Sequence, residues 1–390
     1  MRDLIFVSME DWDEVWRRNQ FLCAALARRF PQMKILFVGL TINVSHHIRH
    51  GSVGKIFRQM TWQVPGFRNI TVMHAIKLLP DSITPARKFN EFVARTQIRG
   101  VAERLGMRNP ILWLNPHSSV HMPGLMGERC VVYDITDDWG LVPSLTPSER
   151  KLTIEQDRAL TSRADLVVVC SEALERSRRE QAREILLVPN GVDVTHYAAV
   201  GSPTADRPWP GPVFGYTGTL HTDRTDVRII IDLARAFPRG SVVLVGPDHW
   251  KPRDRELLAL EKNVFMPGAV PYSKIPGIMS QFDVCIVPHV ETTFTESLNP
   301  IKLWEYLAGG KPIVSTNIAG FRDYPHLCRI ASSSDAFIAA CRVALEEGTA
   351  LRDARIAEAS LHTWEARLDM LLENFEKHDW IPAAGALAPA

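Results

Sequence analysis

One stretch of the sequence combines the start of an anion-binding helix with a charged pair. Asn299 is a preferred N-cap and Pro300 suits the first helical position, so the sequence predicts a short helix that ends at Gly309–Gly310. The free N–H groups of such a helix start attract phosphate, and Lys302 in the first turn would add to this attraction. The carboxylate of Glu305 falls on roughly the same face and could accept hydrogen bonds from two vicinal hydroxyls. These groups suit the phosphate and ribose of a nucleotide. The alternative is a capped helix with a Lys–Glu pair on a solvated face.

A turn near residue 217 carries glycines that could approach a phosphate. It follows an expected strand at 213–216 and contains Gly215, Gly218 and Thr219. Its spacing is not GxGxxG, and a tight βα turn is the alternative. Arg224 follows it, either as a phosphate clamp or as an ordinary exposed arginine. No GxxxxGK[ST] motif occurs in the sequence, so NTP hydrolysis of the P-loop kind is unsupported.

The stretch 267–272 is expected to be a non-helical loop between a strand and a helix. It contains Val270 and Tyr272, and its free backbone groups could pair with the edge of a flat base. A plain connection explains it equally well.

Two acidic pairs follow expected strands of the first half of the chain. Asp137 and Asp138 come after a strand at 130–134, where a partly dehydrated carboxylate beside a like charge could act as a general base. A helix cap or a solvated turn is the alternative. Asp11 and Asp13 reproduce the DxD string of metal-dependent sugar transferases, but no second ligand cluster accompanies them, so we expect no metal.

The elements that position these residues form two consecutive series of alternating strands and helices. With 390 residues the chain exceeds a single usual core, and the two series predict two doubly wound α/β domains with a ligand cleft between them. The expected segments are an acceptor-binding domain at 1–190, a proline-rich linker at 191–212, a second domain at 213–350, a C-terminal helix at 351–380 that packs back on the first domain, and a disordered tail at 381–390.

Composition is that of a soluble globular protein, with 46% hydrophobic and 23% charged residues. The six cysteines are scattered without metal-like spacing, which predicts buried thiols in a reducing compartment. The sequence shows neither an apolar run of about 20 residues nor a signal-peptide core, so we expect a cytoplasmic protein.

The net charge of +1 conceals a basic segment. Residues 17–108 hold 16 Lys and Arg against 3 acidic residues, a balance of +13. Such a segment could attract an anionic membrane on the inner face of the plasma membrane or a phosphorylated acceptor, and a well-solvated surface is the alternative. Nucleic acid is disfavoured because no recognised binding motif accompanies the charge.

Taken together, the motifs resemble those of GT-B glycosyltransferases, and more closely the family 4-like enzymes of teichuronic-acid and xanthan-type exopolysaccharide assembly. The resemblance rests on the turn at 215–218, the stretches at 263–272 and 283–288, and above all the stretch at 299–312; patterns after the first strand, at 133–139 and at 188–193, extend it over nearly the whole chain.

The resemblance implies two Rossmann-like domains facing across a cleft, with a nucleotide-sugar donor, usually UDP-linked, on the second domain and the acceptor on the first. Glu305 would then hold the ribose, Lys302 and the turn at 215–218 the diphosphate, and the loop at 268–272 the base. Enzymes of this fold need no bound metal, so no cofactor is expected. The acceptor would be a saccharide or a lipid-linked saccharide.

The chain departs from the family pattern at one position. Family 4 enzymes usually carry Glu-x7-Glu, but Ser297 stands where the first Glu belongs, and Glu296 is one residue out of register. Because that carboxylate normally touches the donor sugar, we expect an inverting mechanism with Asp137 or Asp138 as the base. A nucleotide-sugar epimerase or hydrolase, and a non-catalytic nucleotide-sugar-binding scaffold of a polysaccharide assembly complex, are the alternative functions.

Overall fold

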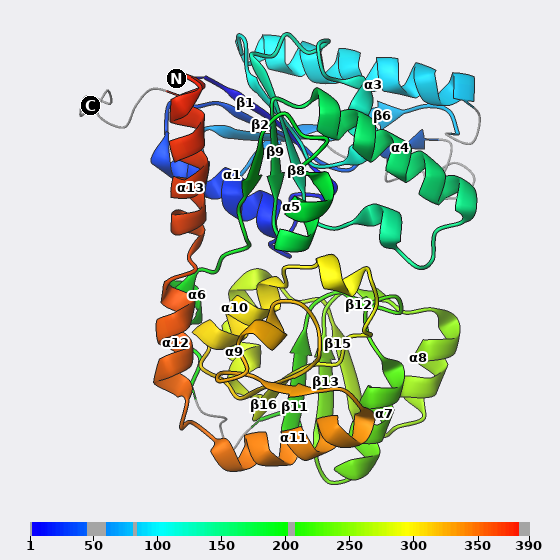
Figure 1. Ribbon diagram of the computed structural model, residues 1–390, viewed down its shortest axis with the longest axis vertical. Coiled ribbons are helices and arrows are strands. Elements are labelled where there is room, and N and C mark those ends of the chain that lie inside the picture. The colour runs from blue at the N-terminus through cyan, green and yellow to red at the C-terminus, as the bar shows by residue number, and fades with distance from the viewer. Residues whose placement is uncertain (1, 45–59, 81–83, 202–206, 382–390) are drawn as a thin grey trace. The chain divides into compact units, whose positions relative to one another are not determined.

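The computed structural model describes residues 2–44, 60–80, 84–201 and 207–381. The chain divides into two compact units, each with its own sheet (Figure 1). Unit 1 comprises Met1–Thr136, Thr146–Val188 and Leu368–Ala390, and unit 2 comprises Asp137–Leu145 and Pro189–Arg367. The expected tail lies outside the described residues from 382 onward, as do 45–59 and 81–83 of the basic segment.

Unit 1 is built on an eight-stranded sheet in which every pairing is parallel except that of the edge strand β4 with β5. In spatial order its strands are β10 (Ile185–Leu187), β9 (Leu166–Val169), β8 (Cys130–Ile135), β7 (Ile111–Leu114), β1 (Leu4–Val7), β2 (Ile35–Val38), β5 (Ile70–Met73) and β4 (Thr61–Gln63). A separate two-stranded ribbon joins β3 (Ile42–Asn43) to β6 (Ile76–Lys77).

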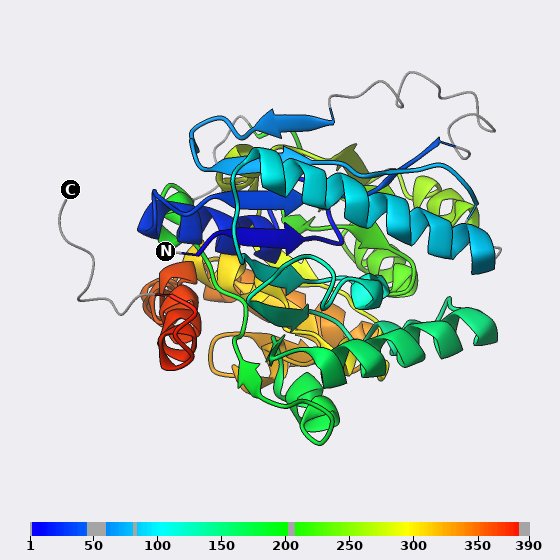
Figure 2. The ribbon, with the colours of Figure 1, turned by 90° about the horizontal axis from the view of Figure 1, so that it is seen from above.

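The inner strands of this sheet carry buried apolar side chains on both faces. Helices therefore cover the sheet on both sides. One face packs against α3 (Thr84–Arg104), α4 (Pro147–Arg163) and α5 (Glu172–Arg178) (Figure 2). On the other face Phe6 stacks between Phe37 and Trp113, and Phe375 from α13 (Trp364–Lys377) meets the Trp113 ring. Among the described residues, the remaining elements of the unit are α1 (Arg18–Arg29) and the short helix η2 (His117–His121).

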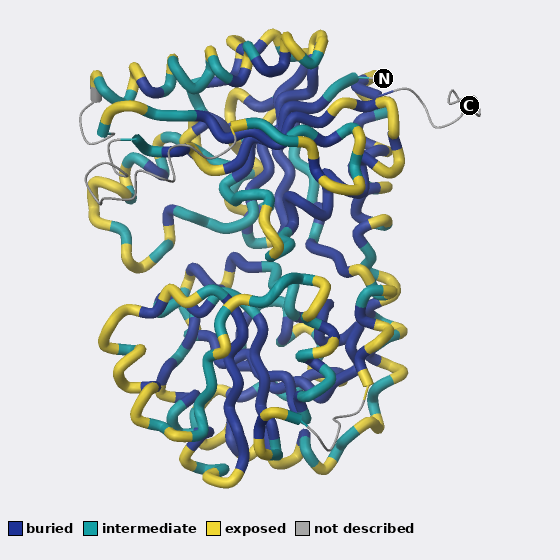
Figure 3. The backbone as a smooth tube through the Cα atoms, turned by 180° about the vertical axis from the view of Figure 1, so that it is seen from behind, coloured by how far each residue is buried: buried dark blue, intermediate teal, exposed yellow. Residues whose placement is uncertain are grey.

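Unit 2 is built on a six-stranded parallel sheet whose four inner strands are buried throughout, while the two edge strands are mostly half-buried (Figure 3). In spatial order they are β15 (Val264–Gly268), β13 (Ser241–Val245), β11 (Val213–Thr217), β16 (Val284–Val287), β17 (Ile313–Thr316) and β18 (Arg329–Ala331). One face packs on α7 (Val227–Ala236) and α11 (Ser334–Glu347), the other on α9 (Ile275–Ser280), α10 (Ile301–Ala308) and α12 (Arg352–Ser360).

Smaller elements complete unit 2. They are η3 (Trp139–Leu141), α6 (Val194–Tyr197), α8 (Pro252–Ala259), η4 (Tyr272–Lys274), η5 (Thr295–Ser297), η6 (Phe321–Asp323) and a ribbon of β12 (Leu220–His221) with β14 (Asp248–His249).

The single helical stretch expected at the C-terminal end is two helices, α12 and α13, which are separated at 361–363. The break has a backbone cause. Val192 forms a parallel bridge with Thr363, and its N–H donates to the His362 carbonyl at 2.9 Å, so these residues pair as an extended strand. Gly191 permits this approach, because a Cβ there would lie 2.9 Å from the Thr363 carbonyl.

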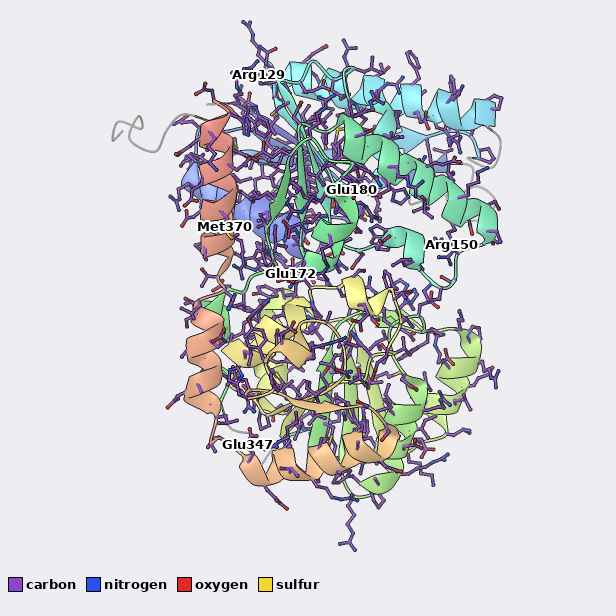
Figure 4. All side chains as sticks on the ribbon, in the orientation of Figure 1. Arg129, Arg150, Glu172, Glu180, Glu347 and Met370 are labelled. Atoms are coloured by element: carbon purple, nitrogen blue, oxygen red, sulfur yellow. The ribbon has the colours of Figure 1, made fainter. Side chains whose placement is uncertain are left out.

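A buried arginine joins α11 to α12. Glu347, labelled in Figure 4 near the end of α11, accepts from Arg355 at 2.5 Å and from Arg329 at 2.7 Å. Arg355 is completely buried and also donates to the Leu327 carbonyl. Its charge is therefore paired, as burial requires.

All six cysteines are buried and free, as the sequence predicted. Of the helices in the described ranges, none has the length and apolar character needed to cross a membrane.

Gly215 lies inside β11, where the ring of Phe282 occupies the space that a Cβ would need, at 2.1 Å. We expect Gly215→Ala to lower the free energy of unfolding by about 1–3 kcal/mol through overpacking. Gly277, an exposed position in α9 with no atom near its Cβ position, is the matched control, and Gly277→Ala should raise stability by up to about 1 kcal/mol. Urea denaturation measures both, and equal effects would contradict the packing role.

Candidate functional site

The helix α10 starts one residue later than predicted. Pro300 rather than Asn299 is its N-cap, and no side chain caps the first turn. The Asn299 side chain is used elsewhere: its Oδ1 accepts from the Asn190 N–H at 2.8 Å, and its carbonyl accepts from the Asn190 side chain at 2.5 Å. The predicted end is confirmed, since α10 stops at Ala308 and Gly310 adopts a φ of +65°.

The Glu305 carboxylate is buried within unit 2. It is 3% exposed and forms an ion pair with Lys302 at 2.6 Å. The i,i+3 pair of the alternative interpretation is therefore present, but Glu305 does not lie on a solvated face.

Two tyrosines surround this carboxylate. Burial raises the pKa of both Tyr197 and Tyr272, and the nearby negative charge of Glu305 raises each further. The Tyr272 ring stacks on His196 with centroids 3.9 Å apart, and His196 Nε2 lies 3.0 Å from the Tyr272 carbonyl. The carboxylate thus lies near two tyrosines, of which Tyr272 packs on His196.

Three glycines with positive φ follow adjacent strands at the carboxyl edge of the unit 2 sheet. They are Gly218 after β11, Gly246 after β13 and Gly268 at the end of β15, with φ values of 152°, 155° and 89°. A Cβ on Gly246 would lie 1.8 Å from the Gly218 carbonyl oxygen, so only glycine allows these loops to approach. Carboxyl edges of parallel sheets are where ligands bind in open α/β folds.

Several residues near these glycines were predicted to bind the donor, but their hydrogen bonds and packing in the structure are with other parts of unit 2. The Gly218 N–H donates to the Val245 carbonyl at 2.8 Å, so it shapes the rim of the sheet and does not point to a ligand. Thr219 is half-buried between Gly218 and β12, and Val270 packs on the core beneath α10. Pro267 and Gly268 belong to β15, so the predicted loop begins later than expected.

Arg224 and Asp137, predicted for different roles, form an ion pair. Their side chains meet at 3.1 Å, and the Arg224 guanidinium lies 5.1 Å from the centroid of the Phe294 ring. Burial raises the pKa of Asp137, and the Asp138 charge acts in the same direction, while Arg224 opposes both. The expected upward shift is present, with burial as its largest cause.

The segment Asp137–Leu145 follows β8 in the chain but packs with unit 2. The Asp138 N–H donates to the Ser297 hydroxyl at 3.3 Å, and this hydroxyl donates to the Phe294 carbonyl at 2.7 Å. Glu296, the residue one position out of the family register, instead pairs with Arg322. Ser297 therefore holds the acidic segment where the family pattern has a carboxylate.

Tyr216 lies close enough to both Arg224 and Glu305 to be influenced by their charges. Its hydroxyl lies 3.3 Å from His289 Nε2, and burial raises the pKa of Tyr216 to about 12, with Glu305 raising it and Arg224 lowering it. Burial and the Arg224 charge lower the pKa of His289 to about 3, so this histidine is neutral. The sequence analysis did not select four residues near these charges as site residues: Tyr197, Tyr216, Gly246 and His289. The one signal in the sequence was that each lies at or near the end of a strand or helix.

The structure thus brings together Asp137 with Arg224, and Lys302 with Glu305 and Tyr272, whereas Gly215 lies apart in the strand core. The first-strand acids have local partners: Asp11 accepts from the Leu40 N–H at 2.8 Å, and Asp13 pairs with Arg17 at 3.3 Å. Within the part of the chain that the structure describes, no group of three His, Cys, Asp or Glu side chains is arranged to hold a metal ion.

Comparison with known proteins identifies the class to which this fold belongs. Residues 211–347 match the family model described as Glycosyl transferases group 1. Sucrose-phosphate synthase from Thermosynechococcus elongatus shares the fold with a TM-score of 0.73 at 16% identity, over 97% of this chain and 100% of that one. Anabaena HepE in complex with UDP gives a TM-score of 0.62 at 13% identity, over 96% and 100% of the two chains. The protein is a glycosyltransferase of the GT-B type.

A relative among curated proteins agrees with this assignment. The chain is 24% identical over 339 residues to the Bacillus subtilis (strain 168) protein named "Putative teichuronic acid biosynthesis glycosyltransferase TuaH", covering 80% of each chain. The resemblance to GT-B enzymes of this group and the two-domain α/β fold, both predicted from the sequence, are confirmed.

The buried ion pair of α10 predicts an asymmetric response to mutation. Lys302→Met should lower the free energy of unfolding by about 1–3 kcal/mol, because it leaves the Glu305 carboxylate buried without its cation; the partial exposure of Lys302 keeps the loss below that of a fully buried pair. Adding Glu305→Leu should recover part of the loss.

The exposed pair of Lys151 and Glu155 provides the control, since Lys151→Met should change stability by less than about 0.5 kcal/mol. Denaturant unfolding measures all three variants. A double variant less stable than Lys302→Met would contradict the explanation.

Proposed function

We propose that this glycosyltransferase moves a sugar from a UDP-linked donor to a saccharide or lipid-linked saccharide acceptor during the assembly of a cell-surface or exopolysaccharide. The relative named for teichuronic acid biosynthesis supports the polysaccharide product, and the structural neighbour in complex with UDP supports the nucleotide.

The buried Glu305 carboxylate carries this proposal. A buried carboxylate needs hydrogen-bond donors, and the two vicinal hydroxyls of a ribose supply them in the geometry that its oxygens accept. The uncapped start of α10 lies one helical turn before it and offers backbone N–H groups to a phosphate. Ribose and phosphate recognition therefore fall on one short helix.

The donor diphosphate leaves with negative charge, and cationic groups are available to neutralise it. Lys302, Arg224 and the positive end of α10 would supply this stabilisation, which is the role that a metal ion has in other transferases. We therefore propose a metal-independent reaction.

We assign the general base to the acidic segment and choose Asp137 within it. In the proposed step Asp137 takes the proton of the acceptor hydroxyl, the hydroxyl oxygen bonds to the anomeric carbon, and the bond from that carbon to the diphosphate breaks with inversion. Two observations support Asp137: burial raises its pKa toward the range in which a base works, and its partner Arg224 is a group that a diphosphate would attract. Anomeric analysis of the product by NMR tests the stereochemistry, and a retained configuration would overturn inversion.

Glu305→Ala should weaken UDP binding by about 1–3 kcal/mol, because a charged hydrogen-bond acceptor is lost. Titration calorimetry measures the affinity, and thermal shift with UDP, GDP and their sugars shows whether UDP stabilises selectively. Glu261→Ala, which removes a carboxylate paired with Arg235 on the α7–α8 side of unit 2, is the control and should bind UDP normally. Unchanged affinity of Glu305→Ala would remove this residue from the site, and no shift with any nucleotide would overturn the proposed function.

Asp137→Asn should lower the transfer rate by about 10²–10⁴-fold without lowering UDP affinity, because the base acts on the acceptor and the loss of its charge leaves Arg224 free for the diphosphate. In the wild type the base must be ionised, so kcat/KM should fall as the pH drops through the pKa of Asp137. Since burial raises that pKa, the fall should begin above the ordinary Asp range near about 4. Asp138→Asn is the companion variant, and full activity of both would refute a base in this segment.

A further inference from the structure

Three neighbouring strands of unit 1 bring a carboxylate beside an imidazole. Asp11 lies in the loop after β1, Leu40 in the loop after β2, and His74 directly follows β5; these strands are consecutive in the sheet. The Asp11 Oδ1 atom lies 3.4 Å from His74 Nδ1. Open α/β sheets bind ligands beyond the carboxyl ends of their strands, which is where this pair lies. The proposed transfer step uses neither residue.

Gly39 leaves the room in which the two side chains meet. A Cβ at this position would lie 2.9 Å from Asp11 Oδ1 and 3.2 Å from His74 Cε1. The N–H of Leu40, the next residue, donates to the same Asp11 oxygen at 2.8 Å. The loop after β2 therefore fixes the carboxylate against the imidazole, and it passes too close to both to carry a side chain at residue 39.

The backbone determines which nitrogen of His74 carries a proton. Nδ1 lies 2.8 Å from the Leu40 carbonyl oxygen, which can only accept a hydrogen bond, so Nδ1 is the donor. In the neutral imidazole Nε2 then holds a lone pair and acts as an acceptor. The Trp62 ring packs on the imidazole with centroids 5.1 Å apart, which restrains the direction in which Nε2 points.

One acceptor atom on each side chain is left for a ligand. His74 is only 4% exposed, yet no described residue forms a hydrogen bond with its Nε2, and solvent still reaches this nitrogen. Asp11 Oδ2 likewise has no hydrogen bond within the described ranges, and the Asp11 side chain is 28% exposed. Because both atoms accept hydrogen bonds, a ligand that fits here must supply two donors.

The vicinal hydroxyls of a saccharide meet this requirement. One hydroxyl can donate to the imidazole lone pair and its neighbour to the carboxylate oxygen, whereas the charge of Asp11 would repel a phosphate. The half-buried Trp62 ring beside the imidazole offers an apolar surface to the C–H face of a sugar ring. The chemistry of the pair therefore favours a neutral sugar over an anion.

We propose that Asp11 and His74 bind a pair of hydroxyls of the acceptor saccharide on unit 1. The pair holds hydroxyls other than the one that reacts, so it positions the acceptor without removing its proton. That the bound saccharide is the acceptor rests on the proposed function, whereas the hydroxyl-binding site rests on the geometry of unit 1 alone.

NMR titration of the full chain with the methyl glycosides of glucose, galactose, mannose and N-acetylglucosamine tests this site. The wild type should bind at least one of them weakly. Monodeoxy analogues of that sugar should then identify two hydroxyls whose removal weakens binding by about three- to tenfold each, which is the value of one hydrogen bond.

Two substitutions of His74 separate ligand binding from a structural role. His74→Asn keeps an amide N–H near the place of Nδ1 for the Leu40 carbonyl and removes Nε2. It should keep Tm within about 3 °C of the wild type and weaken sugar binding by about three- to tenfold. His74→Gln places its amide near Nε2 and loses the Leu40 bond, so it should bind sugar better than His74→Asn despite a lower Tm. A purely structural histidine predicts the opposite order.

His378→Asn is the matched control. His378 also lies in unit 1, where its Nε2 pairs with Glu184 at 2.7 Å, and its replacement should leave sugar binding unchanged. In His74→Asn, removal of the sugar hydroxyl that meets Nε2 should cost nothing further, because both changes remove the same hydrogen bond.

Failure of every methyl glycoside to bind, or equal binding by the wild type and His74→Asn, would overturn the site. Sugar binding that is lost in His74→Asn, in a protein that shows no response to UDP, would uphold the site while the proposed function fails. A response to UDP without sugar binding would overturn the site alone, so the two failures are distinguishable.

Discussion

The site in unit 2 depends on pairing a carboxylate with a cation where water scarcely reaches it. Glu305 is 3% exposed, and the ammonium of Lys302 one turn earlier in α10 compensates its charge. The pair fits a short helix: Lys302 lies in the first turn of α10 and its ammonium reaches forward three residues to Glu305. The helix ends before Gly309 and Gly310, after which the chain enters β17. The tyrosines near the carboxylate stay protonated, because burial and, after it, the same negative charge raise their pKa values.

The second ion pair, Arg224 with Asp137, is held by loop segments and not by a helix. Arg224 leaves the loop after β11, which is attached to the loop after β16 through the bridge of Thr225 with His289 and the bond from the Val290 N–H to the Arg224 carbonyl. Its partner Asp137 arrives from a separate segment, which Ser297 fastens to unit 2. Neutral His289 lies beside Arg224 without adding a second positive charge. Arg224 is therefore positioned by the loops after β11 and β16, which are neighbours in the sheet, and Asp137 by the attachment of its segment to Ser297.

Sequence reasoning recovered most strands, because buried parallel strands are short, continuous apolar runs, and it placed the helix of Lys302 and Glu305 within one residue. It missed β18 and α11, although Ser333 and the spacing of Phe337 and Cys341 mark a capped amphipathic helix. The sequence analysis could not predict the ion pair of Arg224 with Asp137. The two residues are 87 positions apart, and each alone is typical of a surface charge. Gly215 was assigned to a phosphate turn from local spacing, and only the position of Phe282 indicates its packing role.

Unit 2 is not one continuous piece of chain, and this affects how it can be dissected. Its main part runs from Pro189 to Arg367, but Asp137–Leu145 belongs to it as well. A fragment cut at the obvious boundary near residue 189 would keep the Lys302–Glu305 pair and lose Asp137, leaving Arg224 without its carboxylate. The phosphate-binding site of such a fragment would be more positive than that of the whole protein. Anion affinities measured on the fragment would therefore differ from those of the whole protein.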